Sequence, residues 1–150
     1  MKSIAQNYAA TQLGPIREWA RHSFRHAAFP QPVPGKAFIK EDLALSGMEI
    51  SFNYVPKGGA IPFYHRHKSN EELYVFLSGR GELQVDDVTI PVAEGSAVRV
   101  SPAGKRAWRN IGEDALVFLC IQARAGALAQ GDISDGEIVP GAVVWKQTAA

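Results

Sequence analysis

Short β-prone runs separated by glycine and proline dominate residues 36–146. Met48–Tyr54 alternates apolar and polar residues, which is typical of a strand with two unlike faces. Leu73–Leu77 is a continuous apolar run, and Asp86 and Asp87 stand between two further runs as a two-residue hairpin turn. The connections are too short for crossover helices, so we expect antiparallel pairing. The pattern predicts an all-β sandwich or barrel.

Further strands are expected on the same grounds. They cover Glu82–Val85, Val88–Val92, Ala97–Val100, Ala107–Asn110, Ala115–Ile121 and, as a last edge strand, Val143–Trp145.

Residues 1–35 differ from this pattern, and we predict that they are irregular or partly helical. Pro15 is suited to the first turn of a short helix running to about His26. On that helix His22 and His26 would lie one turn apart, and we interpret them as part of a solvated basic face. The chain is therefore divided into an N-terminal arm, residues 1–35, and a β-barrel domain, residues 36–146.

Composition excludes several functions. The 150 residues carry a formal net charge of +1, which provides no field to attract nucleic acid or anionic lipid. The longest apolar run, Ala115–Ile121, is far shorter than the roughly 20 residues of a membrane helix. Cys120 is the one cysteine, so no intrachain disulfide forms, and we interpret it as inert packing. We expect a cytoplasmic protein with neither nucleic acid nor membrane as a partner.

One group of residues has the chemistry of a metal site. His65 and His67 stand two positions apart, which on an extended strand points both imidazoles to one face. Glu71 and Glu72 follow shortly after. Two imidazoles and a carboxylate can hold a divalent transition metal and leave positions open for a substrate. The alternative without a metal site is that these glutamates form ion pairs with nearby basic residues on the surface.

Aromatic residues near this group are candidates to line a ligand pocket. Phe63, Tyr74 and Phe76 are the candidates, although aromatic residues in strands are more often plain core.

Five of these positions also carry a family resemblance. Gly59, His65, His67, Glu72 and Gly79 have the spacing G-x5-H-x-H-x4-E-x6-G, which resembles the first motif of the cupin superfamily at every fixed position. The resemblance implies a double-stranded β-helix, or jelly-roll barrel. It also implies that His65, His67 and Glu72 bind a metal, commonly iron, manganese, nickel, zinc or copper. In this motif six residues separate the glutamate from the last glycine, and this spacing from Gly79 identifies Glu72, rather than Glu71, as the implied carboxylate ligand.

The second cupin motif is only partly present. Gly95, Pro102, Gly104 and Asn110 follow its order, but the family's third histidine ligand, four residues before the asparagine, is replaced by Arg106. Arginine keeps its charge and has no lone pair to donate. The four-ligand set that the resemblance implies is therefore incomplete.

Three arrangements remain open at this position. His65, His67 and Glu72 hold a metal without a fourth protein ligand. Alternatively, Arg106 points into the barrel and clamps a carboxylate or phosphate of a ligand. In the third arrangement Arg106 pairs with Glu72 or Glu71, and the pocket has no metal.

Two other sets of polar residues have undecided roles. Glu49, Ser51 and Asn53 form a polar stripe on one strand, which we expect to face solvent rather than the barrel interior. Cys120 and Gln122 share one strand parity and are candidates to face the cavity.

Function therefore divides between two main hypotheses. One is a metalloenzyme with isomerase, epimerase or dioxygenase chemistry on a small molecule, whose anionic group Arg106 orients. The alternative is a non-catalytic ligand-binding or sensor protein without metal; a purely structural protein is a third. The resemblance also implies a homodimer assembled through residues 1–35, which would cover an open sheet edge.

Overall fold

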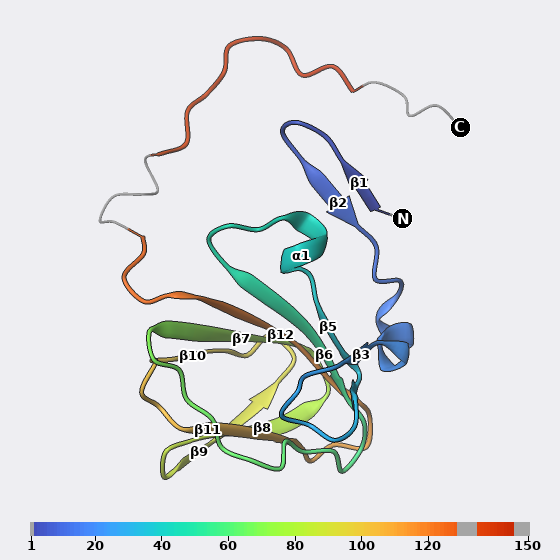
Figure 1. Ribbon diagram of the computed structural model, residues 1–150, viewed down its shortest axis with the longest axis vertical. Coiled ribbons are helices and arrows are strands. Elements are labelled where there is room, and N and C mark those ends of the chain that lie inside the picture. The colour runs from blue at the N-terminus through green and yellow to red at the C-terminus, as the bar shows by residue number, and fades with distance from the viewer. Residues whose placement is uncertain (1, 129–134, 146–150) are drawn as a thin grey trace.

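The computed structural model describes residues 2–128 and 135–145, and its strands form two main antiparallel sheets (Figure 1). The larger sheet has the order β10-β7-β12-β6-β5 and the smaller has the order β11-β8-β9. The larger sheet consists of β5 (Lys36–Phe38), β6 (Glu49–Val55), β7 (Asn70–Ser78), β10 (Ala97–Val100) and β12 (Leu116–Arg124). The smaller consists of β8 (Arg80–Val85), β9 (Val88–Ala93) and β11 (Arg106–Asn110). This is the predicted all-β jelly roll.

One hydrophobic core fills the space between the sheets. Phe76 of β7 and Phe118 of β12 pack with ring centroids 5.3 Å apart, and Leu83 of β8 is buried in the same cluster. The turns that close this core are the predicted ones. Val85 pairs with Val88 across the two-aspartate turn, and Gly79 between β7 and β8 has φ +84°.

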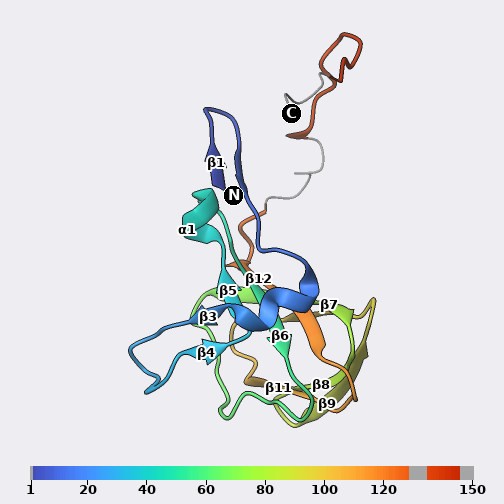
Figure 2. The same cartoon turned by 90° about the vertical axis from the view of Figure 1, so that its right-hand side faces the viewer.

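The N-terminal arm contains more strand than the sequence predicted. β1 (Lys2–Ile4) pairs with β2 (Ala9–Thr11), and β3 (Ser23–Phe24) pairs with β4 (Val33–Pro34). The four-residue helix α1 (Lys40–Leu43) follows β5. Figure 2 shows the arm running from the projecting β1–β2 hairpin down the side of the barrel.

The predicted helix from Pro15 to His26 is shorter than expected. A 3-10 helix occupies Ile16–Arg21, and His22 is already in extended backbone. The helix stops there because Trp19 packs edge-on against Phe52 of β6, at 4.7 Å between ring centroids, and the chain then enters β3. His22 and His26 therefore do not share a helical face.

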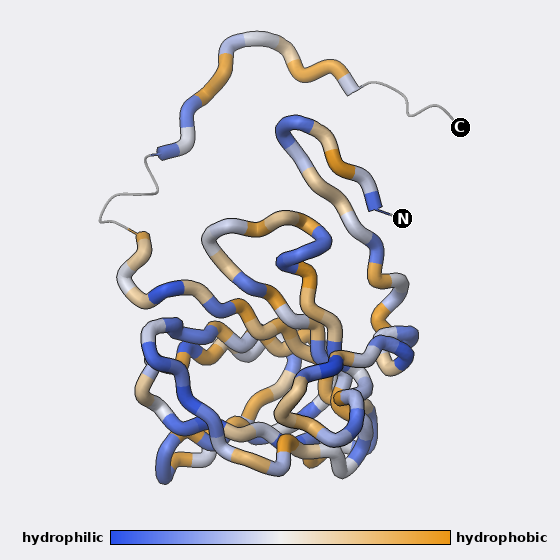
Figure 3. The backbone as a smooth tube through the Cα atoms, viewed as in Figure 1, coloured by the Kyte–Doolittle hydropathy of each residue, from blue (hydrophilic) through white to orange (hydrophobic). Residues whose placement is uncertain are grey.

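The predicted edge strand Val143–Trp145 is also wrong. These residues lie outside both sheets, in an extended segment that contains hydrophobic residues and stands away from the barrel (Figure 3). Trp145 is 90% exposed. The β-branched residues have the propensity for a strand, but propensity forms no strand without a neighbouring one to pair with.

The arm reverses the predicted orientation of β6. Ser51 and Asn53, expected to face solvent, are 2% and 3% exposed and point into the barrel. The apolar residues of the same strand face outward, where the arm covers them, as the contact between Phe52 and Trp19 shows. A strand covered on both sides does not need its apolar face toward the barrel interior.

The helices of the described residues are the 3-10 turn and α1, and neither could cross a lipid bilayer.

Candidate metal centre

The register of the larger sheet sets inward-facing side chains in rows across β5, β6, β12 and β7. The three rows are Glu49, Gln122 and Glu72; then Phe38, Ser51, Cys120 and Tyr74; then Lys36, Asn53, Phe118 and Phe76. The first row ends in a carboxylate, and the third ends in two aromatic rings. One inner wall therefore carries both a polar group of side chains and the start of the hydrophobic core.

Backbone bonds to β11 and to the turn before it hold the two histidines over this wall. His65 and Arg106 exchange both backbone hydrogen bonds, at 3.2 and 3.0 Å, in an isolated β-bridge. The His67 amide donates to the Pro102 carbonyl at 2.9 Å. The segment between β6 and β7 is thus fixed where both imidazoles reach Glu72.

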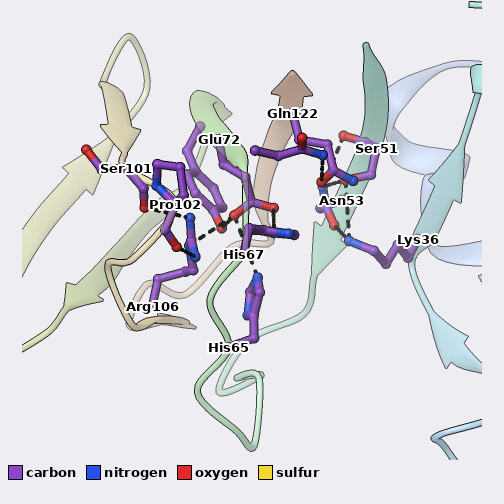
Figure 4. Close-up of polar contacts among 12 residues, drawn as sticks. Lys36, Ser51, Asn53, His65, His67, Glu72, Ser101, Pro102, Arg106 and Gln122 are labelled. Carbon is purple, nitrogen blue, oxygen red and sulfur yellow. Dashed lines mark hydrogen bonds and ion pairs between the residues drawn. The ribbon is translucent and has the colours of Figure 1, made fainter. Parts of the chain in front are cut away.

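The three side chains form one compact cluster (Figure 4). Nε2 of His67 donates to Oε1 of Glu72 at 3.0 Å, and Nε2 of His65 lies 3.6 Å from Oε2. One ligand atom from each residue lies within 4.8 Å of the other two. Glu71, the neighbouring candidate, points to the surface and pairs with Arg99 at 2.6 Å.

Arg106 lies inside the barrel beside this cluster. Its side chain is fully buried, and its Nε lies 3.1 Å from Oε2 of Glu72. The two terminal nitrogens donate to the carbonyls of Ser101 and Pro102, at 3.3 and 3.5 Å. The guanidinium is therefore an ion-pair partner of Glu72, and its terminal nitrogens are already bonded to backbone.

Glu72 is held as a carboxylate. Burial by itself raises the pKa of Glu72, but the contacts with His65 and Tyr74 and the charges of His67 and Arg106 outweigh it and lower the pKa to about 2. The Tyr74 hydroxyl donates to Oε2 at 2.5 Å. Burial, with Cys120 and Glu72 nearby, raises the pKa of Tyr74, so the phenol stays a neutral donor.

The predicted ligand-lining residues lie in different places. Tyr74 touches the cluster through Glu72, and Phe63 is partly exposed, stacks on Phe29 at 5.4 Å and meets His65 edge-on at 6.2 Å. Phe76 lies in the core against Phe118 and is not brought to the cluster.

Lys36 is the residue that the sequence reasoning missed. Nζ of Lys36 donates to Oδ1 of Asn53 at 2.6 Å and to Oγ of Ser51 at 3.3 Å. The Trp108 ring lies 5.8 Å from the ring of His65. The buried polar stripe of β6 was the available signal, since an inward stripe requires polar partners.

A hollow of about 340 Å³ opens at the end of the first row. Glu49 and Gln122 line it together with Asn70, which donates to Gln122 at 3.4 Å. A second hollow of about 380 Å³ includes Phe63 and Trp108 in its lining. Neither hollow includes His65, His67 or Glu72 in its lining.

The donor set fits a divalent transition metal. Contacts of 3.0 and 3.6 Å between donor atoms are the separations expected of neighbouring ligands on bonds of about 2.1 Å. Nδ1 of His65 is buried and has no hydrogen-bond partner among the residues that the structure describes. Arg106 stands where a fourth protein ligand would be, so the set is two imidazoles and one carboxylate.

A jelly roll with two histidines and a glutamate on its inner wall is the architecture of a cupin barrel, and the comparisons agree. The cupin domain profile matches residues 52–122. A cupin protein of Bacteroides fragilis superposes with a TM-score of 0.67 and 38% identity, over 70% of this chain and 89% of that one. The chain belongs to the cupin superfamily.

Two further matches are more distant. A Photorhabdus luminescens protein shares the fold with a TM-score of 0.54 at 13% identity, over 60% of this chain and 74% of that one. An uncharacterized protein of Methanocaldococcus jannaschii is 32% identical over 62 residues, which are 41% of this chain and 50% of the other. The match thus spans half the length of that curated relative.

Proposed function

We propose that this chain is a metal-binding cupin that acts on or binds a small, anionic organic molecule in its barrel. The observation that carries the proposal is the cluster of His65, His67 and Glu72, whose ligand atoms lie within 4.8 Å of one another. Glu72 is ionised at neutral pH, because its pKa is lowered to about 2, so no proton has to leave it before it can ligate.

The residues around the cluster have separate roles in this proposal. A bound ion would supply either Lewis acidity for an isomerase or epimerase, or a redox centre for a dioxygenase. Tyr74 fixes one carboxylate oxygen of Glu72, which orients the ligand group. The cation Lys36, on which the charge of Glu72 acts, has no ion-pair partner among the described residues and favours a ligand of negative charge. Iron, manganese, nickel, zinc and copper all suit this donor set.

A second candidate function is a metal-free cupin that binds or senses a small ligand. The ion pair between Arg106 and Glu72 favours it, because both oxygens of Glu72 already have protein partners. A nearby cation also opposes the binding of a dication.

Elemental analysis of the purified protein after reconstitution separates the two functions. We expect about one equivalent of a transition metal, lost in the variant His65→Ala/His67→Ala. The matched control is His22→Ala/His26→Ala, which removes two histidines from the arm and should keep the metal. A wild type without metal after reconstitution with each candidate ion would contradict the first function and support the second.

Assembly is a further part of the proposal. The β1–β2 hairpin stands clear of the barrel in Figures 1 and 2, so it can reach a second copy, and we propose a homodimer built through residues 1–35. Light scattering should give the mass of a dimer, and a monomer at micromolar concentration would contradict it. The barrel boundary at residue 146 and the cytoplasmic location stay predictions.

A further inference from the structure

Lys36 is a charged side chain that the cluster of His65, His67 and Glu72 does not use. It points into the barrel from β5, and its hydrogen-bond acceptors are Asn53 and Ser51, both neutral. Among the described residues no carboxylate lies within ion-pair distance of Lys36. Its ammonium group therefore has neutral hydrogen-bond partners and no ion pair.

Such an arrangement is costly without a counter-ion. Lysine is seldom buried unless it is paired, because desolvation disfavours the charged form. Burial lowers the pKa of Lys36, against the opposing influence of Cys120, Glu72 and Glu49. The ring centroid of Phe38, 4.9 Å from Nζ, contributes some cation–π attraction, which is weaker than an ion pair.

Lys36 and its polar neighbours Ser51 and Asn53 have hydrogen-bond donors that the protein does not use. Two of the three N–H donors of the ammonium are used. Oγ of Ser51 accepts from Lys36 and from Nδ2 of Asn53 at 3.0 Å, so its own hydrogen is left to donate. One N–H and one O–H match the two oxygens of a carboxylate.

One indole connects this group to the metal cluster. The Trp108 ring centroid lies 5.8 Å from Nζ of Lys36, and the same ring lies 5.8 Å from the ring of His65. Figure 4 shows Lys36 and Glu72 approaching the same interior from opposite sides. Both groups therefore lie near one indole ring, and the charge of Glu72 acts to raise the pKa of Lys36.

We propose that Lys36 and Ser51 form a carboxylate-binding subsite, and that the molecule bound at His65, His67 and Glu72 carries a carboxylate that pairs with the Lys36 ammonium. The inference rests on the proposed function and defines its ligand class. That class is an acid with a carboxylate at one end and a metal-binding oxygen at the other, of which a short dicarboxylate is the simplest member.

Isothermal titration calorimetry with acetate, malonate, succinate and glutarate tests the subsite on the metal-loaded full chain. The variants are Lys36→Met and Lys36→Gln, which remove the charge, and Lys36→Arg, which keeps it. Lys57→Met is the matched control, since Lys57 is an exposed lysine that pairs with Glu113.

We expect the best dicarboxylate to bind roughly ten-fold or more weakly to both neutral variants, at unchanged metal content. Lys36→Arg and Lys57→Met should stay near wild type. Lys36→Gln keeps a donor for Asn53, so it separates the loss of charge from a failure to fold.

Three results would overturn the inference. They are equal dicarboxylate affinity in a folded neutral variant and wild type, a lower melting temperature as the sole effect of Lys36→Gln, and no binding of any probe to wild type. The proposed function fails separately, if the wild type takes up no metal. In that case weaker acetate binding by Lys36→Gln in the metal-free protein still supports the subsite.

Discussion

The buried carboxylate of Glu72 predicts how the metal-free protein responds to acid. Its pKa is lowered from 4.5 to about 2, and its side chain is only 7% exposed. A carboxyl group whose folded pKa is depressed stabilises the fold above its unfolded pKa, and this contribution is lost as the pH falls toward the folded pKa. Lowering the pKa of Glu72 to this extent corresponds to about 3 kcal/mol of unfolding free energy at neutral pH, of which about 2 kcal/mol is lost by pH 3.

Urea unfolding of chelator-treated protein, followed by circular dichroism between pH 7 and pH 3, measures this contribution. The double variant Glu72→Gln/Arg106→Met removes both charges of the buried pair, so neither is left unpaired. Its loss of stability across this range should be smaller than that of wild type by about 2 kcal/mol.

An exposed ion pair provides the control. Glu82→Gln/Arg109→Met removes the pair between Arg109 and Glu82, in which the arginine side chain is largely exposed. Such pairs contribute little, so this variant should keep the acid profile of wild type. If Glu72→Gln/Arg106→Met loses as much stability in acid as wild type does, the attribution to Glu72 is refuted.

Three further outcomes follow from the structure. Arg106→His removes the competing cation and adds an imidazole, so the Kd for Zn²⁺ in competition with a chromophoric chelator should fall roughly tenfold or more; an unchanged Kd would contradict the role given to this position. Gly79→Ala should lower the unfolding free energy, measured in urea, by at least about 2 kcal/mol more than Gly95→Ala does. Both residues have positive φ, but only at Gly79 would a Cβ overlap the Ala115 carbonyl. Equal losses of unfolding free energy would argue against that overlap. Cys120 should react with a thiol reagent much more slowly in the folded protein than in urea, because it is 8% exposed and burial raises its pKa; equal rates would show that the thiol is accessible.

The sequence predicted the parts of the structure that depend on local pattern. Glycine and proline separated most strands of the barrel correctly, because turn chemistry is encoded in a few adjacent residues. The spacing of His65 and His67 predicted two imidazoles on one face, and the isolated bridge between His65 and Arg106 supplies the extended backbone that this requires. Local pattern was thus sufficient to find the cluster.

What the sequence did not predict depends on tertiary packing. Ser51 and Asn53 were predicted to face solvent, but the structure buries them. The outer face of β6 is covered by Trp19, which lies more than thirty residues earlier in the chain, so the local pattern of β6 does not reveal this cover. Lys36 was missed for the same reason, since its partners become interior residues only when the arm covers the opposite face. The short helix ending at Arg21 also reflects packing, because Trp19 and the pairing of β3 compete with helix propensity.

The third of the three open arrangements is observed in part. Arg106 does pair with Glu72, yet the two histidines remain gathered around the same carboxylate. The pair alone does not require the histidines there, because Tyr74 already donates a hydrogen bond to Oε2 and Arg106 supplies the opposite charge. Retaining two imidazoles beside a charged carboxylate is what a metal site requires.

The charges of the interior connect the metal to the ligand. Glu72 and Arg106 are the only buried charged side chains among the described residues, and they cancel. The partly buried Lys36 has no ion-pair partner among those residues, although Glu49 lies on the same inner wall and acts to raise the pKa of Lys36. One carboxylate on the ligand is sufficient to neutralise the Lys36 ammonium. A divalent ion with neutral imidazoles adds two positive charges, so a ligand with more than one negative charge is then favoured. Metal loading should therefore shift preference from acetate toward dicarboxylates, and the size of that shift should fall when Lys36 is replaced by glutamine.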